Sequence, residues 1–215
     1  MKKVVFIIVA LLGINGLQAQ DIKSYKFDNH LKPKLGLTTG TGINWLANGL
    51  EESDPRLGFN IGTVFNVPLS RQISIEFESV FSKKGGQVFY QSNSWYAGKV
   101  KYNLYYFDFP VLVKCKLNPV ISLTAGFQQG YLVDADVEYL DPYVYGFVEL
   151  NESALDQWNS SVIGGVAFGG RNRSLELRFV YGLNSVANST YGNYFLEDAQ
   201  NIAFQICFKR YFGRR

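Results

Sequence analysis

The sequence has no long apolar run, and after residue 20 no segment could cross a membrane as a helix. The run from Val4 to Leu12 falls far short of the roughly 20 residues that a spanning helix needs. It follows two lysines and precedes small and polar residues, which is the pattern of a secretory signal peptide. We therefore expect residues 1–19 to be a signal peptide cleaved between Ala19 and Gln20, and the mature protein to be exported.

Histidine is almost absent, which excludes several kinds of active site. The one histidine, His30, precedes the first expected strand, so it argues against a multi-histidine metal site or a Ser/His/Asp triad. The sequence also lacks a P-loop and the HExxH, GxSxG and CxxC patterns. We predict no catalytic residue, no cofactor and no bound metal.

Cysteine is scarce as well. In an exported chain the two cysteines invite a disulfide between Cys115 and Cys207. The strand phases described below place Cys115 on the outward face and Cys207 on the inward face, so their Cβ vectors point apart. We expect two reduced, buried thiols, with the disulfide as the alternative.

Charge of one sign does not accumulate. Without residues 1–19 the chain has 19 basic and 18 acidic side chains, which gives no electrostatic reason to expect nucleic acid as a partner. Aromatic residues make up 16% of the sequence and glycines number 21, whereas there are only six prolines and one methionine. This composition favours β structure over helical bundles.

Eight segments show the alternation of apolar and polar residues that is typical of half-buried strands. They cover residues 35–46, 56–67, 72–81, 105–114, 120–131, 158–168, 174–183 and 201–212. The links between them alternate between tight turns, around PLSR, LNP and GGRNR, and long polar loops, at residues 48–56, 84–102, 134–156 and 186–199.

This rhythm of short and long links is expected of strands that cross a bilayer, with turns in the periplasm and loops outside. The sequence predicts an all-β fold, an eight-stranded antiparallel up-and-down transmembrane β-barrel in the outer membrane. Residues 20–34 would form a periplasmic leader and residues 35–212 the barrel. A soluble periplasmic lipid carrier is the alternative, although such barrels do not sort their links in this way.

The two faces of the expected strands differ in chemistry. In YYFDFPVLVK, residues 105–114, the aromatic and valine positions face lipid and Asp108, Pro110 and Lys114 face the lumen. Pro110 removes one ladder hydrogen bond, so we expect a bulge or local kink there. Aromatic residues near the outer strand ends fit an interfacial girdle. These residues are Trp45, Tyr102, Tyr105, Tyr131 and Tyr181.

The inward phase carries charges that we expect to neutralise one another in a lumen charge network. Eight strands enclose only enough space for side chains to fill, so we predict a plugged lumen. Inward glycines, such as Gly62 and Gly126, should make room for larger neighbours. The network comprises Glu76, Glu78, Asp108, Lys114, Glu176, Arg178 and Lys209, and Gln205 shares its phase.

Five motifs in order resemble the PorT-like outer-membrane barrels of Bacteroidota, over nearly all of residues 35–212. An acidic strand ends in a lysine-glycine step, a tyrosine-x-acid-x-proline strand ends in lysine, and an arginine-bearing strand ends in a tyrosine-glycine-leucine corner. The residues concerned are Glu76, Glu78, Lys84, Gly85, Tyr106, Asp108, Pro110, Lys114, Arg178, Tyr181, Gly182 and Leu183. The resemblance implies an outer-membrane barrel and, through the founding member, an association with secretion machinery.

We expect a non-enzymatic, monomeric outer-membrane protein that contacts lipid and uses its extracellular loops as an interaction scaffold for a protein or glycan partner. Exposed loop aromatics suit such contacts. A small solute channel is the first alternative and an enzyme acting on lipid or peptide the second. The loop acids could hold calcium, but we expect them to be solvated. These acids are Glu51, Glu52, Asp54, Asp134, Asp136, Glu138, Asp141, Glu149, Glu152, Asp156, Glu197 and Asp198.

Overall fold

The computed structural model describes residues 32–49, 53–90, 98–139, 155–170, 172–188, 196 and 198–212. The expected signal peptide, its expected cleavage site at Ala19 and Gln20, and His30 lie outside these residues. In the described part of the chain no helix is long and apolar enough to span a membrane.

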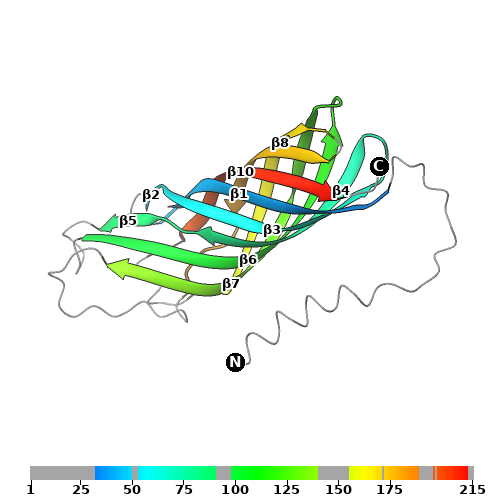
Figure 1. Ribbon diagram of the computed structural model, residues 1–215. Coiled ribbons are helices and arrows are strands. Elements are labelled where there is room, and N and C mark those ends of the chain that lie inside the picture. Colours follow the sequence, from blue (N-terminus) through cyan, green and yellow to red (C-terminus); the bar gives the residue numbers. More distant parts are fainter. Residues whose placement is uncertain are drawn as a thin grey trace, which may run out of the picture. The chain divides into compact units, whose positions relative to one another are not determined.

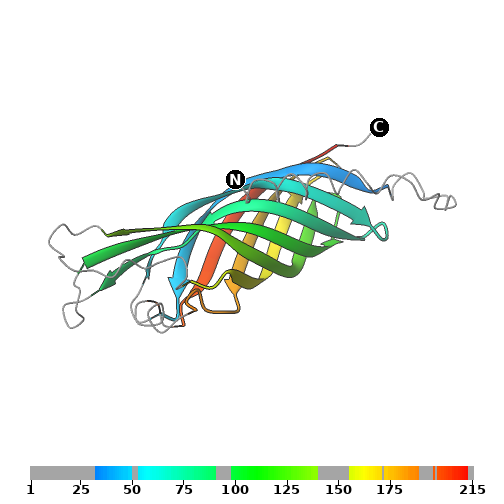
Figure 2. The same cartoon turned by 90° about the horizontal axis from the view of Figure 1, so that it is seen from below.

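Eight long strands form a closed antiparallel ring (Figures 1 and 2). The strands are β1 (Lys34–Ala47), β3 (Arg56–Pro68), β4 (Ile73–Lys84), β6 (Gly98–Lys116), β7 (Ile121–Tyr139), β8 (Trp158–Gly169), β9 (Arg173–Gly182) and β10 (Gln200–Phe212). Each pairs with the next along the chain, and β10 pairs with β1, from Leu35 opposite Phe212 to Ala47 opposite Gln200. The predicted eight-stranded up-and-down barrel is confirmed.

Two short strands, β2 (Ser53–Asp54) and β5 (Gln87–Tyr90), lie beyond the ring. β5 pairs with the start of β6 in the same register as β4, so Gly85 and Gly86 only interrupt one long strand. Gly85 has a φ of 115°, a conformation that favours glycine. The predicted loop boundaries at 84–102 and 134–156 are therefore wrong. The ladder continues to Tyr90, resumes at Gly98 and extends along β7 to Tyr139.

The three tight turns lie at one end of the barrel, which we call the turn end; the opposite end is the loop end. In the first turn the backbone N–H groups of Leu69 and Ser70 both donate to the carbonyl of Ile73, at 2.9 and 3.0 Å. In the second, the side-chain oxygen of Asn118 accepts from the N–H groups of Val120 (2.9 Å) and Ile121 (2.7 Å). Local hydrogen bonds of this kind favour short connections.

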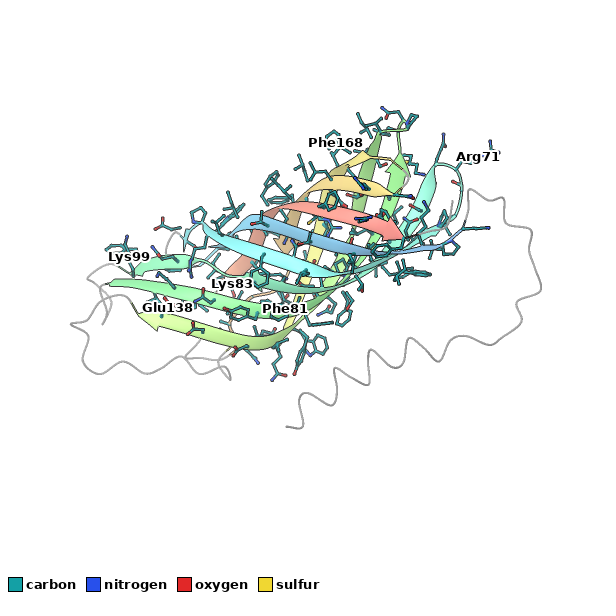
Figure 3. All side chains as sticks on the ribbon, in the orientation of Figure 1. Arg71, Phe81, Lys83, Lys99, Glu138 and Phe168 are labelled. Atoms are coloured by element: carbon teal, nitrogen blue, oxygen red, sulfur yellow. The ribbon has the colours of Figure 1, made fainter. Side chains whose placement is uncertain are left out.

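Apolar residues alternate with inward-facing residues along each strand, and this gives the barrel an apolar outer surface (Figure 3). Its exposed side chains include Leu37, Ile43, Leu57, Phe59, Ile61, Phe65, Phe77, Phe109, Val111, Val113, Leu123, Phe127, Val162, Leu175, Phe179, Phe204, Ile206 and Phe208. Ile202 also faces outward but is only 8% exposed, because it lies between Trp45 and Tyr181 on the adjacent strands. A soluble protein rarely exposes so much contiguous apolar surface.

The predicted bulge at Pro110 is wrong. The β4–β6 ladder lacks two pairs beside Pro110, but its register is the same on both sides of the gap, with Phe77 opposite Val111 and Val80 opposite Asp108. The register shift lies instead between β6 and β7, at Tyr105/Tyr106. The missing N–H of proline thus interrupts pairing without adding a residue.

Inward glycines allow neighbouring strands to approach closely. A Cβ on Gly126 would meet the carbonyl oxygen of Val111 and lie 2.8 and 2.9 Å from the Cα and Cδ2 of Leu112. We expect Gly126→Ala to lower the free energy of unfolding by about 1–3 kcal/mol through overpacking. Gly164 faces outward on β8 with nothing within 4 Å of a Cβ, so Gly164→Ala is the matched control.

Urea titration of both variants in lipid vesicles, read by the electrophoretic shift of folded barrels, measures the difference. Equal unfolding midpoints for the two variants would show that the interior has room at Gly126.

Aromatic residues lie at the loop end on both faces. Tyr131 and Trp158 contact edge to face at 5.1 Å, and Tyr105 stacks on Phe81 at 6.1 Å, both on the outer surface. Tyr102, which we assigned to the same girdle, is 1% exposed and lies inside. The sequence placed Tyr102 in a loop, whereas β6 already runs as a strand there and its even-numbered residues point inward.

Candidate functional site

The structure places the seven expected lumen charges inside the barrel, on the inward phase of β4, β6, β9 and β10. The most exposed of them, Lys114, has 7% of its surface accessible. Charged side chains are almost never buried to this degree unless they are paired. Their pairing divides them into two groups at different heights in the barrel.

Lys209 is the centre of the larger group, which lies toward the turn end. Its ammonium contacts three carboxylates, those of Glu76, Glu78 (2.7 Å) and Glu176 (2.6 Å). Lys209 and Glu176 are both 0% exposed. The three donors of one ammonium therefore each have an acceptor on a different carboxylate.

Arg178 and Lys114 complete this group. Arg178 donates to both oxygens of Glu78, at 2.5 and 2.9 Å, and its Nε donates to Glu176 at 2.9 Å. Lys114 lies 3.2 Å from Glu76. Three acids thus face three bases, and the group carries no net charge. We call these six residues the turn-end network.

Neutral side chains use acceptor positions on the same carboxylates. The hydroxyl of Tyr211 donates to Glu76 at 2.7 Å, and the amide of Asn66 donates to it at 3.1 Å. Thr124 on β7 donates to Glu176 at 2.8 Å. Buried ion pairs stabilise a protein only when such additional hydrogen bonds satisfy their remaining donors and acceptors.

Asp108 does not belong to the turn-end network. It accepts from Lys84 (2.8 Å) and from the hydroxyl of Ser82 (2.5 Å), and Lys84 also lies 4.6 Å from the ring centre of Tyr106. The sequence did not predict this partner, because the expected loop began at residue 84. The signal was present, since Lys84 shares the even-numbered inward phase of Glu76.

An apolar cluster, which the sequence did not predict, fills the lumen at the loop end. Inward residues of β1, β5, β6 and β7 meet residues that follow β9 or precede β8 and β10. We call this cluster the loop-end plug. Its buried members are Leu46, Val88, Val100, Tyr102, Leu104, Tyr106, Leu132, Leu155, Val186, Ala187, Leu196 and Ala199.

Four buried amides lie on the inward face of β1, β7, β8 and β10, and one of them, Asn201, is directly opposite Leu46 of the loop-end plug. Asn44, Gln128, Asn159 and Asn201 are each at most 4% exposed, and each has one side-chain atom without a partner among the described residues. Buried polar atoms are normally hydrogen-bonded, and ordered water satisfies many of them.

The family model for the outer membrane protein beta-barrel domain matches residues 18–188, more than half of the chain. The chain belongs to this outer-membrane β-barrel family. It is therefore an outer-membrane protein, as the sequence predicted. No curated protein matches the chain.

Solved structures of small outer-membrane barrels resemble this one. Neisserial surface protein A (NspA) aligns with a TM-score of 0.51 and 9% identity, over 84% of this chain and 97% of that one. Ail of Yersinia pestis gives a TM-score of 0.46 and 10% identity, over 84% and 99%. OprG from Pseudomonas aeruginosa gives 0.36 and 9%, over 82% and 93%. At this identity the likeness to NspA shows the fold alone.

The remaining predictions for this outer-membrane barrel concern its cysteines and acids. Cys115 and Cys207 are both free, so the expectation that they are not bridged is confirmed. Cys207 is buried, but the expected burial of Cys115 is wrong, because Cys115 is exposed on the outward face near the turn end. Within the described ranges no three His, Cys, Asp or Glu side chains are grouped to hold a metal.

Half of the expected loop acids lie in the described part of the chain. Asp134, Asp136 and Glu138 belong to β7, not to a loop. The acids outside the described residues are Glu51, Glu52, Asp141, Glu149, Glu152 and Glu197.

Proposed function

We propose that this outer-membrane barrel is a non-enzymatic interaction scaffold with a plugged lumen, which presents its loop end to a protein or glycan partner. The observation that carries the proposal is the filling of the interior at both ends. The turn-end network joins β4, β6, β9 and β10 across the lumen, and the loop-end plug covers the other opening.

The loop end also extends beyond a bilayer. β6 and β7 have 19 residues each, about twice the 9–11 that a tilted strand needs to cross a membrane. Together with β5 they project past the other strands in Figures 1 and 2. β7 pairs with β8 only as far as Tyr131, so its last residues extend the projection. A rigid projection is well suited to hold a partner away from the membrane.

Polar contacts stabilise this projection. Asn103 on β6 accepts from Arg56 at 2.8 Å and donates to Asp136 (3.4 Å) and Glu138 (3.3 Å) on β7. Lys101 pairs with Glu138 at 3.4 Å. These ordered groups supply polar contacts, and the exposed ring of Phe89 on β5 supplies an apolar one. Partner surfaces use such a mixture of polar and apolar contacts.

A loop-replacement experiment tests the scaffold. Residues 91–97 and residues 141–153 are replaced separately by short Gly/Ser linkers, and the intact protein and both variants are used to capture partners from cell envelopes. The expected result is the loss of a specific partner from at least one variant, while both keep the electrophoretic shift of a folded barrel. Identical partners for all three proteins would contradict the proposal.

A small channel is the second candidate, and the four buried amides with unpartnered atoms favour it. We expect purified protein in planar bilayers to show no stable, large conductance steps, because a filled lumen of eight strands leaves no continuous path. Stable steps that change in Lys114→Gln or Arg178→Gln would instead support the channel.

The resemblance to PorT-like barrels supports a finer proposal, a role beside secretion machinery. It predicts co-purification of the full chain with secretion components from its native membrane. Retention of normal secretion after deletion of the gene would count against that role.

A further inference from the structure

The outer surface of the barrel carries different charges at its two ends. In the described ranges, the acids on the outer surface or beyond the ring all lie toward the loop end, as Glu138 does in Figure 3, whereas Arg71 in the same view lies at the turn end. Apart from the turn-end network, the charged side chains of the turns and strand ends there are basic, and the described part of that surface has no acid. The bases are Lys34, Arg71, Lys116, Arg173 and Arg210.

Two of these bases form a cross-strand pair. Arg173 on β9 lies directly opposite Arg210 on β10, and both side chains are exposed on the outward phase. Neither has an ion pair with a described residue. Like charges directly opposite each other on adjacent strands are destabilising. The arrangement therefore favours binding of an anion, and the described part of the chain does not supply one.

The pair lies beside the apolar surface of the barrel. The next outward pair toward the middle is Leu175 opposite Phe208, each 44% exposed. Two residues along a strand span about 7 Å, so the guanidinium groups lie within reach of a lipid headgroup when Leu175 and Phe208 contact acyl chains. Guanidinium groups bind phosphate oxygens with two parallel hydrogen bonds.

We propose that Arg173 and Arg210 together bind the phosphate of an anionic phospholipid in the leaflet that surrounds the turn end. In barrels of this kind that leaflet faces the periplasm. One phosphate between the two guanidiniums offsets their mutual repulsion. An anionic headgroup is favoured over a zwitterionic one, because the amine of the latter would add a third positive charge to the site.

Native mass spectrometry of the mature protein tests this site. The protein is released from detergent that contains equal amounts of phosphatidylglycerol and phosphatidylcholine, and the lipids it retains are counted. At about 1 kcal/mol for each basic residue near an anionic surface, two arginines predict a preference for phosphatidylglycerol of about 30-fold. The double variant Arg173→Gln/Arg210→Gln should retain the two lipids almost equally, and Arg210→Gln alone should show an intermediate preference.

The matched control removes two bases from the other end, with Lys83→Gln/Lys99→Gln. Both lysines lie toward the loop end in Figure 3. The control should keep the preference of the unmodified protein, and the electrophoretic shift confirms that each variant is folded. An unchanged preference in the arginine variants, or an equal loss in the control, would overturn the proposal. Stabilisation of the protein in phosphatidylcholine vesicles by inorganic phosphate, to the same extent as by phosphatidylglycerol, would overturn the assignment to lipid.

Discussion

Replacing Lys209 by methionine should lower the free energy of unfolding by about 3–5 kcal/mol, because it removes a cation that contacts three buried carboxylates. Methionine fills a similar volume, so the loss reports on charge and not on a cavity. Arg178 and Lys114 would remain with three acids, which leaves an uncompensated negative charge in the lumen. Urea titration in lipid vesicles, followed by the electrophoretic shift, measures the change.

A second substitution separates the loss of charge balance from a general defect. Glu176→Gln in the Lys209→Met background restores neutrality, so the double variant should regain part of the lost stability. For residues in contact, coupling energies of about 0.5–3 kcal/mol are usual. Lys99→Met at the exposed loop end is the control, with an expected change within about 0.5 kcal/mol. If Lys209→Met is as stable as Lys99→Met, the turn-end network does not stabilise the barrel.

The inward placement of the charged residues could be predicted from the sequence, because successive side chains of a strand point to opposite faces. This parity, odd or even, alone decides which face a residue takes. Glu76 lies between the outward residues Ile75 and Phe77, Glu78 follows Phe77, and Lys114 follows Val113, so each had to face the lumen once the barrel was assumed. The same parity correctly separated Cys115 from Cys207.

The partners of these charges could not be predicted from parity. Glu76 and Lys209 are 133 positions apart in the chain and meet because β10 closes the ring and both side chains point across the lumen. Which residues lie at the same height depends on strand tilt and stagger, which a single sequence does not contain. Asp108 was therefore assigned to one network with Glu76, although it pairs with Lys84 nearer the loop end.

The loop-end plug was missed for a different reason. Each expected strand ended at the expected membrane boundary, so Val100 and Tyr102 fell in the loop at residues 84–102, Tyr102 was also assigned to the girdle, and Leu104 was assigned to neither. The structure continues β6 outward without a break, and alternation then points all three into the lumen. On β7 the register shift opposite Tyr105/Tyr106 changes the phase, so that Ala135 and Val137 pack against this cluster and Asp136 is exposed.

Replacing Val111 by lysine should lower the free energy of unfolding by about 2–4 kcal/mol in lipid vesicles, the cost of a lysine near the bilayer midplane. Val111 is 43% exposed and lies near the middle of the outward stretch of β6 between Tyr105 and Cys115. The lumen and its ion pairs are untouched by this change. The effect therefore depends on what covers the outer surface.

Phe89→Lys is the matched control, because Phe89 is also outward and similarly exposed, at 47%, but lies on β5 beyond the ring. A lysine near or beyond the interface costs about 0–1 kcal/mol. Lipid around the barrel thus predicts a difference of at least about 1 kcal/mol between the variants, measured by urea titration in the same vesicles. In a barrel surrounded by water both lysines would be solvated surface residues with effects within about 0.5 kcal/mol. Equal stability of the two variants would mean that acyl chains do not cover the middle of β6, and both the sealed scaffold and the phospholipid site at Arg173 and Arg210 would lose their physical basis.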